Sequence, residues 1–354
     1  MTVIGYGSVR GRDGDHFAAF RRDADVVDLR SLDTQLFAAG TLDAFLAAGP
    51  STWAQLADAV RDAQATHALA DVHPQLPFTV ADYVDFYASE HHATNAGRIF
   101  RPDGAALPPN WKHLPVGYHG RSASLRVSGE PVPRPSGVLS ADEFGPSQRL
   151  DFEAELAFVV GTRGQRIAVD DADRHVFGVS LLNDWSARDI QAFETQPLGP
   201  FLGKSFATSI SPWITPLAAL DGVRLPTRQD PQPLPHLRDD GRHGLDLDVE
   251  IAINGHVVSR PRFADMHWTY AQMLAHLTSN GAEVRTGDVF ASGTVSGPER
   301  GQRGCLLELS WNGTDPLAVG AETRAWLRDG DEVSIRASAG SIALGDVTSI
   351  VVAG

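Results

Sequence analysis

The sequence predicts an α+β protein that is mainly β. Gly and Pro supply 34 and 22 of its 354 residues, a share above the usual one that favours many turns between short strands. Segments with strand periodicity do not alternate regularly with helical ones, which disfavours a doubly wound parallel sheet. At this length two domains are the natural expectation, because a domain usually holds roughly 100–200 residues.

Residues 1–75 are predicted to form a small N-terminal domain of short strands and helices. Val26 to Leu29 has the pattern of a short strand, and STWAQLADAVRDAQ that of a helix. Thr52, with Gln55 three positions later, forms a capping-box pattern at the start of this helix. The stretch DVHPQLPFTV, from Asp71, contains two prolines and is interpreted as a linker, so the second domain is predicted to span residues 76–354.

The second domain is predicted to be mainly β, with one clear helix. In LDLDVEIAINGHVVS apolar and acidic residues alternate, and Asn254-Gly255 supplies the two positive-φ positions of a tight hairpin turn. Tyr270, Met273, Leu274 and Leu277 follow the i, i+3, i+4, i+7 spacing of a helix face.

Composition excludes several classes of function. The formal net charge of −14 disfavours binding to nucleic acid or to an anionic membrane. The single cysteine, Cys305, excludes an internal disulfide and a thiolate zinc site. No apolar leader and no run long enough to span a membrane is present, so a cytoplasmic protein is predicted.

The segment RLDFEAELAFVVG, from Arg149, raises the main question about function. It has the pattern of a β-strand with an apolar end, yet it places Asp151, Glu153 and Glu155 on one face. Side chains two positions apart on a strand point to the same side, roughly 6.5–7 Å from each other.

Two further carboxylates lie beside segments that are expected to be buried. Asp85 sits among aromatic residues, and Asp184 follows the apolar run FGVSLLN. Together with Glu153 and Glu155, and without a matching lysine cluster, they would repel one another unless something neutralises them. A hard divalent cation would do so, and ligands that are all oxygen select Mg²⁺ or Ca²⁺.

Ordinary structural roles are the alternative for these carboxylates. Glu153 and Glu155 could form the exposed face of an antiparallel sheet. Asp184 could cap a helix that starts at Trp185, and Asp85 could be a loop residue. Spacing alone does not decide between these roles and a metal site.

His92 and Glu308 are candidates for an acid–base pair. His92 lies in SEHHATNAG, where Ser89 is expected to cap a short helix, and Glu308 lies in LLELSW, which is interpreted as an apolar strand. A carboxylate that orients a histidine is a common way to make a general base. The sequence alone does not pair the two residues, and a solvated or structural histidine is the alternative.

Five motifs closely resemble the fumarylacetoacetate hydrolase family. They are DFYASEHHATNAGRIFR, NWKHLPVGYHGR, LDFEAELAFVVG, LLNDWSARDIQAFETQPLGPFLGKSFATSISPW and ASGTVSGPE. They follow the family's order from about Asp85 to about Gly345. The resemblance implies a catalytic domain built as a mixed β-roll behind a small β-barrel-like N-terminal domain, in a homodimer.

The resemblance also implies an activity and a metal site. Family members hydrolyse a carbon–carbon bond in a 1,3-diketone acid, giving fumarate and acetoacetate at the end of tyrosine and phenylalanine breakdown. The expected cofactor is Mg²⁺ or Ca²⁺. The implied metal ligands are Asp85, Glu153, Glu155 and Asp184, with Lys204 and Thr208 near the metal and the lysine able to join only through its backbone.

The remaining roles are carried over from the family in the same way. His92 matches the general base and Glu308 the carboxylate that orients it. The polar groups around the reacting carbonyl match Arg188, Gln191 and Lys204. Substrate contacts match Tyr87, Arg101, Tyr118, Gln191, Thr195 and Thr294.

This chain departs from the family at one substrate contact and in its N-terminal domain. Thr195 stands where the family has a tyrosine, so the identity of the acyl group stays open. The N-terminal domain is also shorter than is usual. The alternatives to fumarylacetoacetate are another acylpyruvate or β-diketone acid, then decarboxylation or isomerisation of an oxo-acid, and lastly a non-catalytic, metal-stabilised dimer.

Overall fold

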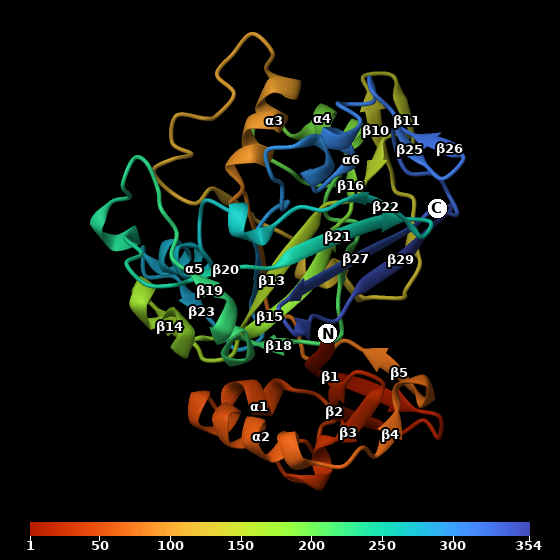
Figure 1. Cartoon of the computed structure of the whole chain (residues 1–354). Helices are drawn as coiled ribbons and strands as arrows, with labels where there is room; N and C mark the ends of the chain where they lie inside the picture. Colours follow the sequence, from red (N-terminus) through yellow and green to blue (C-terminus); the bar gives the residue numbers. More distant parts are fainter.

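The computed structural model describes all residues, 1–354, and shows a mainly β molecule with short helices (Figure 1). Residues from the N-terminal segment form one end of the molecule, and the remaining chain forms a larger body with α3, α4 and α6 at the opposite end (Figure 1). None of the helices is both long enough and apolar enough to cross a bilayer. The strands and sheets of the structure confirm the mainly β character that the sequence predicts.

The N-terminal segment contains two helices and the strands β5-β1-β2-β3-β4, which form one end of an 11-stranded sheet because β1 also pairs with β28 (Ile342–Ala343) of the larger body. No ladder joins β4 to β5, so the barrel-like form expected for this segment is not confirmed. The bounds are β1 (Thr2–Gly11), β2 (His16–Arg22), β3 (Asp25–Asp28), β4 (His67–Ala68), β5 (Val72–Gln75), α1 (Asp43–Ala47) and α2 (Pro50–Asp62).

Two local predictions in this segment are wrong. Helix α2 begins at Pro50, two residues before the predicted cap at Thr52, and its N-cap is Gly49 with a φ of 82° and no side-chain cap. Proline at the first helical position has the required φ already, so no capping box is needed. Val72–Gln75 is strand β5, paired with β1, so the predicted linker is partly a strand.

The central sheet positions the candidate site. Its order is β7-β6-β24-β13-β15-β17-β8, with β18 also paired to β15. The bounds are β6 (Tyr83–Phe86), β7 (Gly117–His119), β8 (Leu125–Val127), β13 (Ala154–Val160), β15 (Val176–Asp184), β17 (Thr208–Ile210), β18 (Thr215–Pro216) and β24 (Val289–Ala291).

Strand β13 explains why the sequence is apolar on both faces here. Leu156 and Phe158 pack into the core of the larger body, whereas Ala157 and Val159 pack into a second core that is shared with the N-terminal segment. Alternation along the strand places Glu155 on the face of this second core. On this face of β13, the apolar residues Ala157 and Val159 pack against the N-terminal segment, whereas the next position along the strand is the carboxylate Glu155.

A second group of strands lies beside the central sheet and includes the predicted hairpin. Asn254 and Gly255 form its turn with φ values of 50° and 75°, as the sequence predicts. The strands are β9 (Val132–Pro133), β21 (Asp248–Ile253), β22 (His256–Ser259), β27 (Glu332–Ala339), β28 (Ile342–Ala343) and β29 (Val347–Val352).

The remaining strands form isolated pairs, and four helices complete the larger body. The pairs are β10 (Ser136–Ser140) with β11 (Glu143–Pro146), β12 (Leu150–Asp151) with β16 (Ser186–Ala187), β14 (Gly164–Gln165) with β23 (Glu283–Val284), β19 (Arg224–Leu225) with β20 (Gly244–Leu245), and β25 (Leu317–Val319) with β26 (Glu322–Arg324). The helices are α3 (Glu90–Phe100), α4 (Arg188–Glu194), α5 (Tyr270–Thr278) and α6 (Leu306–Leu309). Helix α5 confirms the predicted helix at Tyr270.

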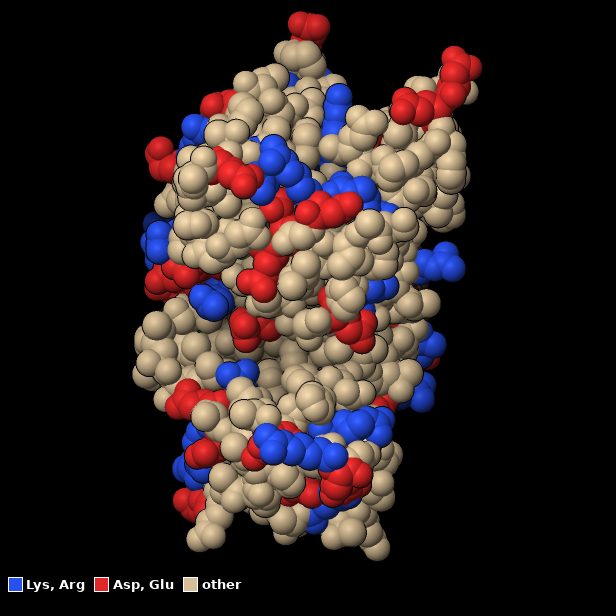
Figure 2. Space-filling view, turned by 90° about the vertical axis from the view of Figure 1, so that its right-hand side faces the viewer, with Lys and Arg blue, Asp and Glu red and all other residues tan.

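Charges of both signs are mixed on the face of the molecule that Figure 2 presents. Figure 2 shows acidic and basic side chains interspersed over the face that it presents, with no large area of one sign. This mixture gives no sign of a nucleic-acid surface on that face, which would need clustered Lys and Arg.

Candidate active site

Four buried carboxylates converge at one end of the central sheet. Asp85 is on β6, Glu155 is on β13, Asp184 ends β15, and Glu153 directly precedes β13. These strands are near one another in the sheet, because β24 lies between β6 and β13 and pairs with both, and β13 pairs directly with β15. One oxygen from each side chain lies within 4.8 Å of the others.

This arrangement overturns the structural alternatives and refines the predicted strand. Glu153 and Glu155 are 4% and 1% exposed, so they do not belong to a solvated sheet face. Asp184 caps no helix, because β16 follows it and α4 begins only at Arg188, with Ala187 as its N-cap. The single strand predicted from Arg149 is broken into β12 and β13, and Glu153 joins only an isolated bridge to Cys305.

The cluster has the chemistry of a site for a hard cation. Glu155 Oε1 and Asp85 Oδ1 are buried and have no hydrogen-bond partner. Burial, followed by repulsion from neighbouring carboxylates, raises the pKa of both Glu155 and Asp85 well above the usual value. Buried carboxylate oxygens without partners are costly unless they are neutralised. These residues therefore fit a divalent cation with oxygen ligands.

Lys204 supplies part of the compensating charge through its side chain, whereas the resemblance implied that this lysine could join the metal site only through its backbone. Its Nζ donates to Asp184 Oδ2 at 2.8 Å and also contacts Glu153 Oε2. Burial raises the pKa of Glu153, but the charges of Lys204 and Arg188 outweigh it and lower that pKa below the usual value. The lysine thus approaches the carboxylates through its side chain. Thr208 Oγ1 donates to Asp184 Oδ1 at 3.2 Å.

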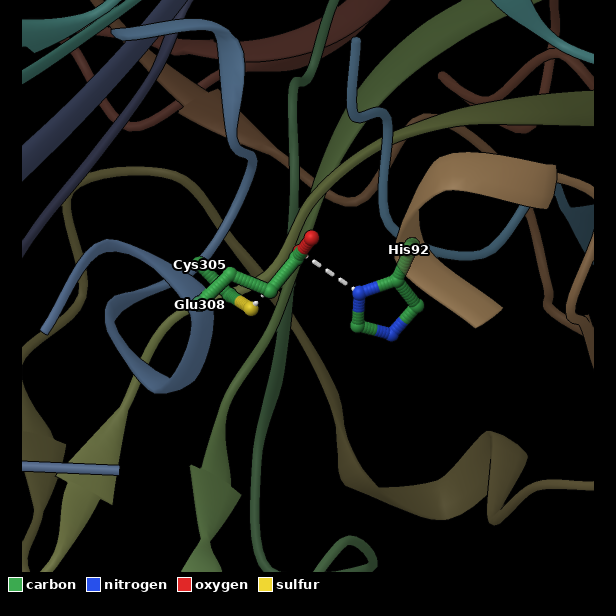
Figure 3. A group of neighbouring side chains, drawn as sticks. All are labelled: His92, Cys305 and Glu308. Carbon is green, nitrogen blue, oxygen red and sulfur yellow. Dashed lines mark hydrogen bonds and ion pairs between the residues drawn. The ribbon is translucent and has the colours of Figure 1, made fainter. Parts of the chain in front are cut away.

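His92 and Glu308 form a buried pair beside the cluster (Figure 3). His92 is on α3, which Ser89 caps as predicted by accepting from the His92 backbone N–H. The His92 Nδ1 lies 2.6 Å from Glu308 Oε2, and its Nε2 lies 3.9 Å from Glu153 Oε1. Burial opposes ionisation of Glu308, but the charge and hydrogen bond of His92 outweigh it and lower the pKa of Glu308 to about 2.

Glu308 lies in helix α6, so the prediction of a strand in LLELSW is wrong. A short apolar run does not by itself distinguish a buried strand from a buried helix.

The Glu308 carboxylate has further partners besides His92. It accepts from Asn95 Nδ2 at 2.9 Å and from Ser296 Oγ at 2.8 Å, and Cys305 Sγ lies 3.2 Å from its Oε2 (Figure 3). Sequence reasoning did not identify these three residues, which come from separate segments.

Arg188 and Gln191 share a face of α4, as their spacing predicts. The Arg188 Nη1 donates to Gln191 Oε1 at 3.1 Å, and its Nη2 donates to Glu153 Oε1 at 2.6 Å. The Arg188 Nε donates to Asp151 Oδ2 at 2.8 Å. Asp151, which the sequence placed beside Glu153, therefore pairs with an arginine rather than joining the carboxylate cluster.

A cavity of about 650 Å³ opens above these groups. Its wall contains the predicted substrate contacts and most of the predicted catalytic and metal residues: Asp85, Tyr87, His92, Arg101, Tyr118, Glu153, Arg188, Gln191, Thr195, Lys204 and Thr294. Glu155, Asp184, Thr208 and Glu308 do not line it. Asp184 and Thr208 line a smaller cavity of about 160 Å³, to which Tyr118 and Lys204 also contribute. The Thr195 hydroxyl donates to the backbone oxygen of Gln191 at 2.5 Å, so it is already engaged within α4.

The site combines a carboxylate cluster suited to a hard cation with a neighbouring histidine–carboxylate pair. This combination is typical of enzymes that use a metal ion together with acid–base catalysis. The model of the fumarylacetoacetate (FAA) hydrolase C-terminal family matches residues 82–352. The chain belongs to this family.

Relatives from distant organisms are similar over most of the chain. Fumarylacetoacetase from Oryza sativa is 48% identical over 284 residues, which cover 76% of this chain and 66% of the rice protein. The Homo sapiens fumarylacetoacetase is 48% identical over 286 residues, 76% of this chain and 68% of the human protein. The chain thus aligns with about two thirds of these relatives.

Solved structures agree in fold at low identity. Fumarylacetoacetate hydrolase from Exiguobacterium antarcticum has a TM-score of 0.66 at 19% identity, and covers 99% of this chain and 100% of its own. A putative HpcE protein from Mycobacterium smegmatis has a TM-score of 0.66 at 22% identity, with coverages of 98% and 99%. These two likenesses support the fold alone.

Proposed function

We propose that this protein hydrolyses fumarylacetoacetate to fumarate and acetoacetate, as a metal-dependent C–C bond hydrolase of tyrosine and phenylalanine catabolism. The observation that carries the proposal is the His92–Glu308 pair. His92 lines the same cavity as Asp85 and Glu153, and its Nε2 lies 3.9 Å from Glu153 Oε1. Fumarylacetoacetases that are 40–48% identical support this substrate.

The proposed base is the Nε2 atom of His92. Its Nδ1 is held by Glu308, so Nδ1 carries the ring proton of the neutral form and Nε2 is free to accept one. His92 takes a proton from water, and the resulting hydroxide attacks the carbonyl on the fumaryl side. The C–C bond then breaks, its electron pair stays with the acetoacetate carbon, and His92 returns the proton to that carbon.

Three donors are proposed for the oxyanion that forms at the attacked carbonyl. Lys204, Arg188 and Gln191 all line the cavity, and Lys204 and Arg188 are both bonded to Glu153. One such donor can contribute about 3 kcal/mol to the transition state. Arg101 has a forked geometry suited to a substrate carboxylate, and Tyr87, Tyr118, Thr195 and Thr294 are the other proposed substrate contacts.

The proposed cofactor is Mg²⁺ or Ca²⁺, held by Asp85, Glu153, Glu155 and Asp184. Lys204 and Thr208 are proposed to lie near it, because both contact Asp184. When bound, a hard cation of this kind supplies charge that favours the enolate of the diketone and of the departing acetoacetate.

Loss of fumarylacetoacetate absorbance tests the proposal directly. Metal-replete protein is expected to consume the substrate, EDTA to stop the reaction, and added Mg²⁺ or Ca²⁺ to restore it. No consumption by metal-replete protein would refute the proposed function.

A variant of the base separates binding from chemistry. His92→Ala is expected to bind the cation normally but not to turn over, because it retains all four carboxylates and lacks the base. His91→Ala, at the neighbouring helix position, is the matched control and is expected to keep activity. A His92→Ala variant with the wild-type rate would contradict the assignment of the base.

One observation favours hydrolysis of another acylpyruvate or β-diketone acid as the second candidate. The Thr195 hydroxyl is bonded to Gln191, which leaves the cavity without a phenol at that point. A panel of diketone acids that differ in the acyl group distinguishes the two candidates by kcat/KM.

Domain division, assembly and location belong to the same proposal. We retain domains at 1–75 and 76–354, a homodimer and a cytoplasmic location. The homodimer is carried over from the resemblance to the FAA hydrolase family. Analytical ultracentrifugation tests the dimer, and a single monomeric species would refute it.

A further inference from the structure

Asp151 is a buried carboxylate whose role is not explained by the steps above. It ends β12, is 0% exposed and does not line the cavity, so it touches no substrate. Its Oδ1 accepts from the Phe152 N–H at 2.8 Å and the Leu306 N–H at 2.7 Å. Its Oδ2 accepts from the Leu307 N–H at 2.9 Å and from Arg188 Nε at 2.8 Å.

These bonds join two elements that carry different parts of the machinery. Arg188 opens α4 and reaches Glu153 and Gln191 with its other nitrogens. Leu306 and Leu307 open α6, in which Glu308 is the next residue. Asp151 therefore binds the oxyanion donor and the helix of the orienting carboxylate at the same time.

Helix α6 depends on this contact because it is short and lacks a cap of its own. It has four residues, and its N-cap residue Cys305 makes no side-chain cap bond. The first N–H groups of a helix have no partner within it. Asp151 accepts from two of them, which fixes the position of the turn that holds Glu308.

We propose that Asp151 is a positioning residue. It fixes the position of Arg188 relative to helix α6, which carries Glu308, so that both keep their places around Glu153. The kinetic part of this proposal rests on the proposed function, whereas the geometric part does not. If Asp151 only balanced the charge of Arg188, its loss would leave the His92–Glu308 pair unchanged.

Asp151→Asn is the test variant, because it preserves volume but replaces one acceptor oxygen with a donor. We expect kcat on fumarylacetoacetate to fall about 10- to 100-fold, since a small misplacement of catalytic groups costs this much. We expect KM to change less than about threefold and the affinity for Mn²⁺, measured by calorimetry, to stay within about threefold, because the carboxylate cluster is intact.

Asp331→Asn is the matched control. Asp331 is also buried, pairs with the buried Arg324 through Nε and Nη2 at 2.9 Å, and accepts from the Arg328 N–H at 2.8 Å, but it does not line the cavity. Its loss is expected to lower thermal stability without changing kcat. An equal fall in kcat in both variants would overturn the proposal, because the effect would then be general destabilisation.

A spectroscopic measurement tests the geometry without any substrate. The short His92 Nδ1–H hydrogen bond to Glu308 is expected to give a downfield proton resonance in the wild type and in Asp331→Asn. Asp151→Asn is expected to shift or remove it. An unchanged resonance in Asp151→Asn, together with wild-type kcat, would overturn the proposal. An unchanged resonance in this variant, when the wild-type protein also has no activity, would count against both the proposal and the proposed function.

Arg188→Lys replaces the test variant if Asp151→Asn does not fold. This change keeps a positive charge but removes the Nε donor to Asp151. We expect the His92 resonance to shift, because the altered Asp151 passes the change to α6 and because Arg188 also bonds to Glu153, whose Oε1 lies 3.9 Å from His92 Nε2. An unshifted resonance in Arg188→Lys overturns the proposal.

Discussion

Glu155→Gln is expected to change stability in opposite directions with and without a divalent cation. In the metal-free protein Glu155 Oε1 is buried without a partner, and the neighbouring carboxylates face it within 4.8 Å. The neutral amide removes this repulsion. With the cation bound, the same change removes a charged ligand.

The size of both effects follows from the geometry. Two unit charges 4.8 Å apart repel by about 3.5 kcal/mol at an effective dielectric constant of about 20. Protonation relieves part of this, so we expect the metal-free variant to gain about 1–3 kcal/mol, or about 2–6 °C in Tm. At a cation concentration of about 100 times the wild-type Kd, the cation stabilises the wild type by about 2.7 kcal/mol, and a variant that binds about 100-fold more weakly by about 0.4 kcal/mol.

The pH dependence has a defined sign. Burial and then the charges of Asp85 and Asp184 raise the pKa of Glu155 well above the ordinary value of a glutamate. A carboxyl with a raised pKa in the folded state makes the folded protein hold a proton that the unfolded chain releases. The metal-free wild type is therefore expected to lose stability as pH rises above about 4.5, and the variant to lose less.

Thermal unfolding in EDTA and in a Mg²⁺ series, followed by calorimetry at several pH values, measures these effects. Glu322→Gln changes the same residue type at an exposed site and is expected to leave the Mg²⁺ increment unchanged. A Glu155→Gln variant that is less stable in EDTA and keeps the wild-type Mg²⁺ increment would refute the reasoning.

Three further predictions follow from the site. Glu308→Gln is expected to lower kcat about 10- to 100-fold, the value of one charge-assisted hydrogen bond, with unchanged cation affinity by calorimetry; wild-type kcat would contradict it. Gly293 has a φ of 74° and donates its backbone N–H to Glu155 Oε2. A Cβ atom added at this position would lie only 2.2 Å from the backbone oxygen of Phe86, so no larger residue fits. Gly293→Ala is therefore expected to lower Tm and weaken Mn²⁺ binding, whereas Gly330→Ala, which meets nothing within 4 Å, should affect only Tm; equal Mn²⁺ affinities would refute this. Thr195→Tyr is expected to narrow the cavity, so that kcat/KM falls more for diketone acids with bulky acyl groups than for small ones, and a uniform change across the panel would contradict it.

Local patterns made several elements predictable from the sequence. The hairpin at Asn254-Gly255 follows from alternation and positive-φ turn residues, and α5 from its apolar spacing. These features depend on neighbours within a few positions, so the sequence contains the whole signal. The motifs that resemble the family supplied the candidate site residues, and eleven of these line the same cavity.

Contacts between distant segments account for what the sequence missed. LLELSW has no local feature that selects a helix over a strand, and Asp151, about 155 positions earlier in the chain, supplies the partners of the first N–H groups of α6. Lys204 bonds to Asp184, which lies 20 positions earlier in the chain, and no local pattern in the sequence predicts this contact.

The sequence by itself determined the mainly β class, the acidic strand and the types of residue available for catalysis, because periodicity and side-chain chemistry are local properties. Only the tertiary structure decided which carboxylates meet, that Asp151 pairs with Arg188, and that His92 finds Glu308 across 216 positions. Burial imposes this choice, since a charge removed from water must find a partner, and the partner can come from any part of the chain.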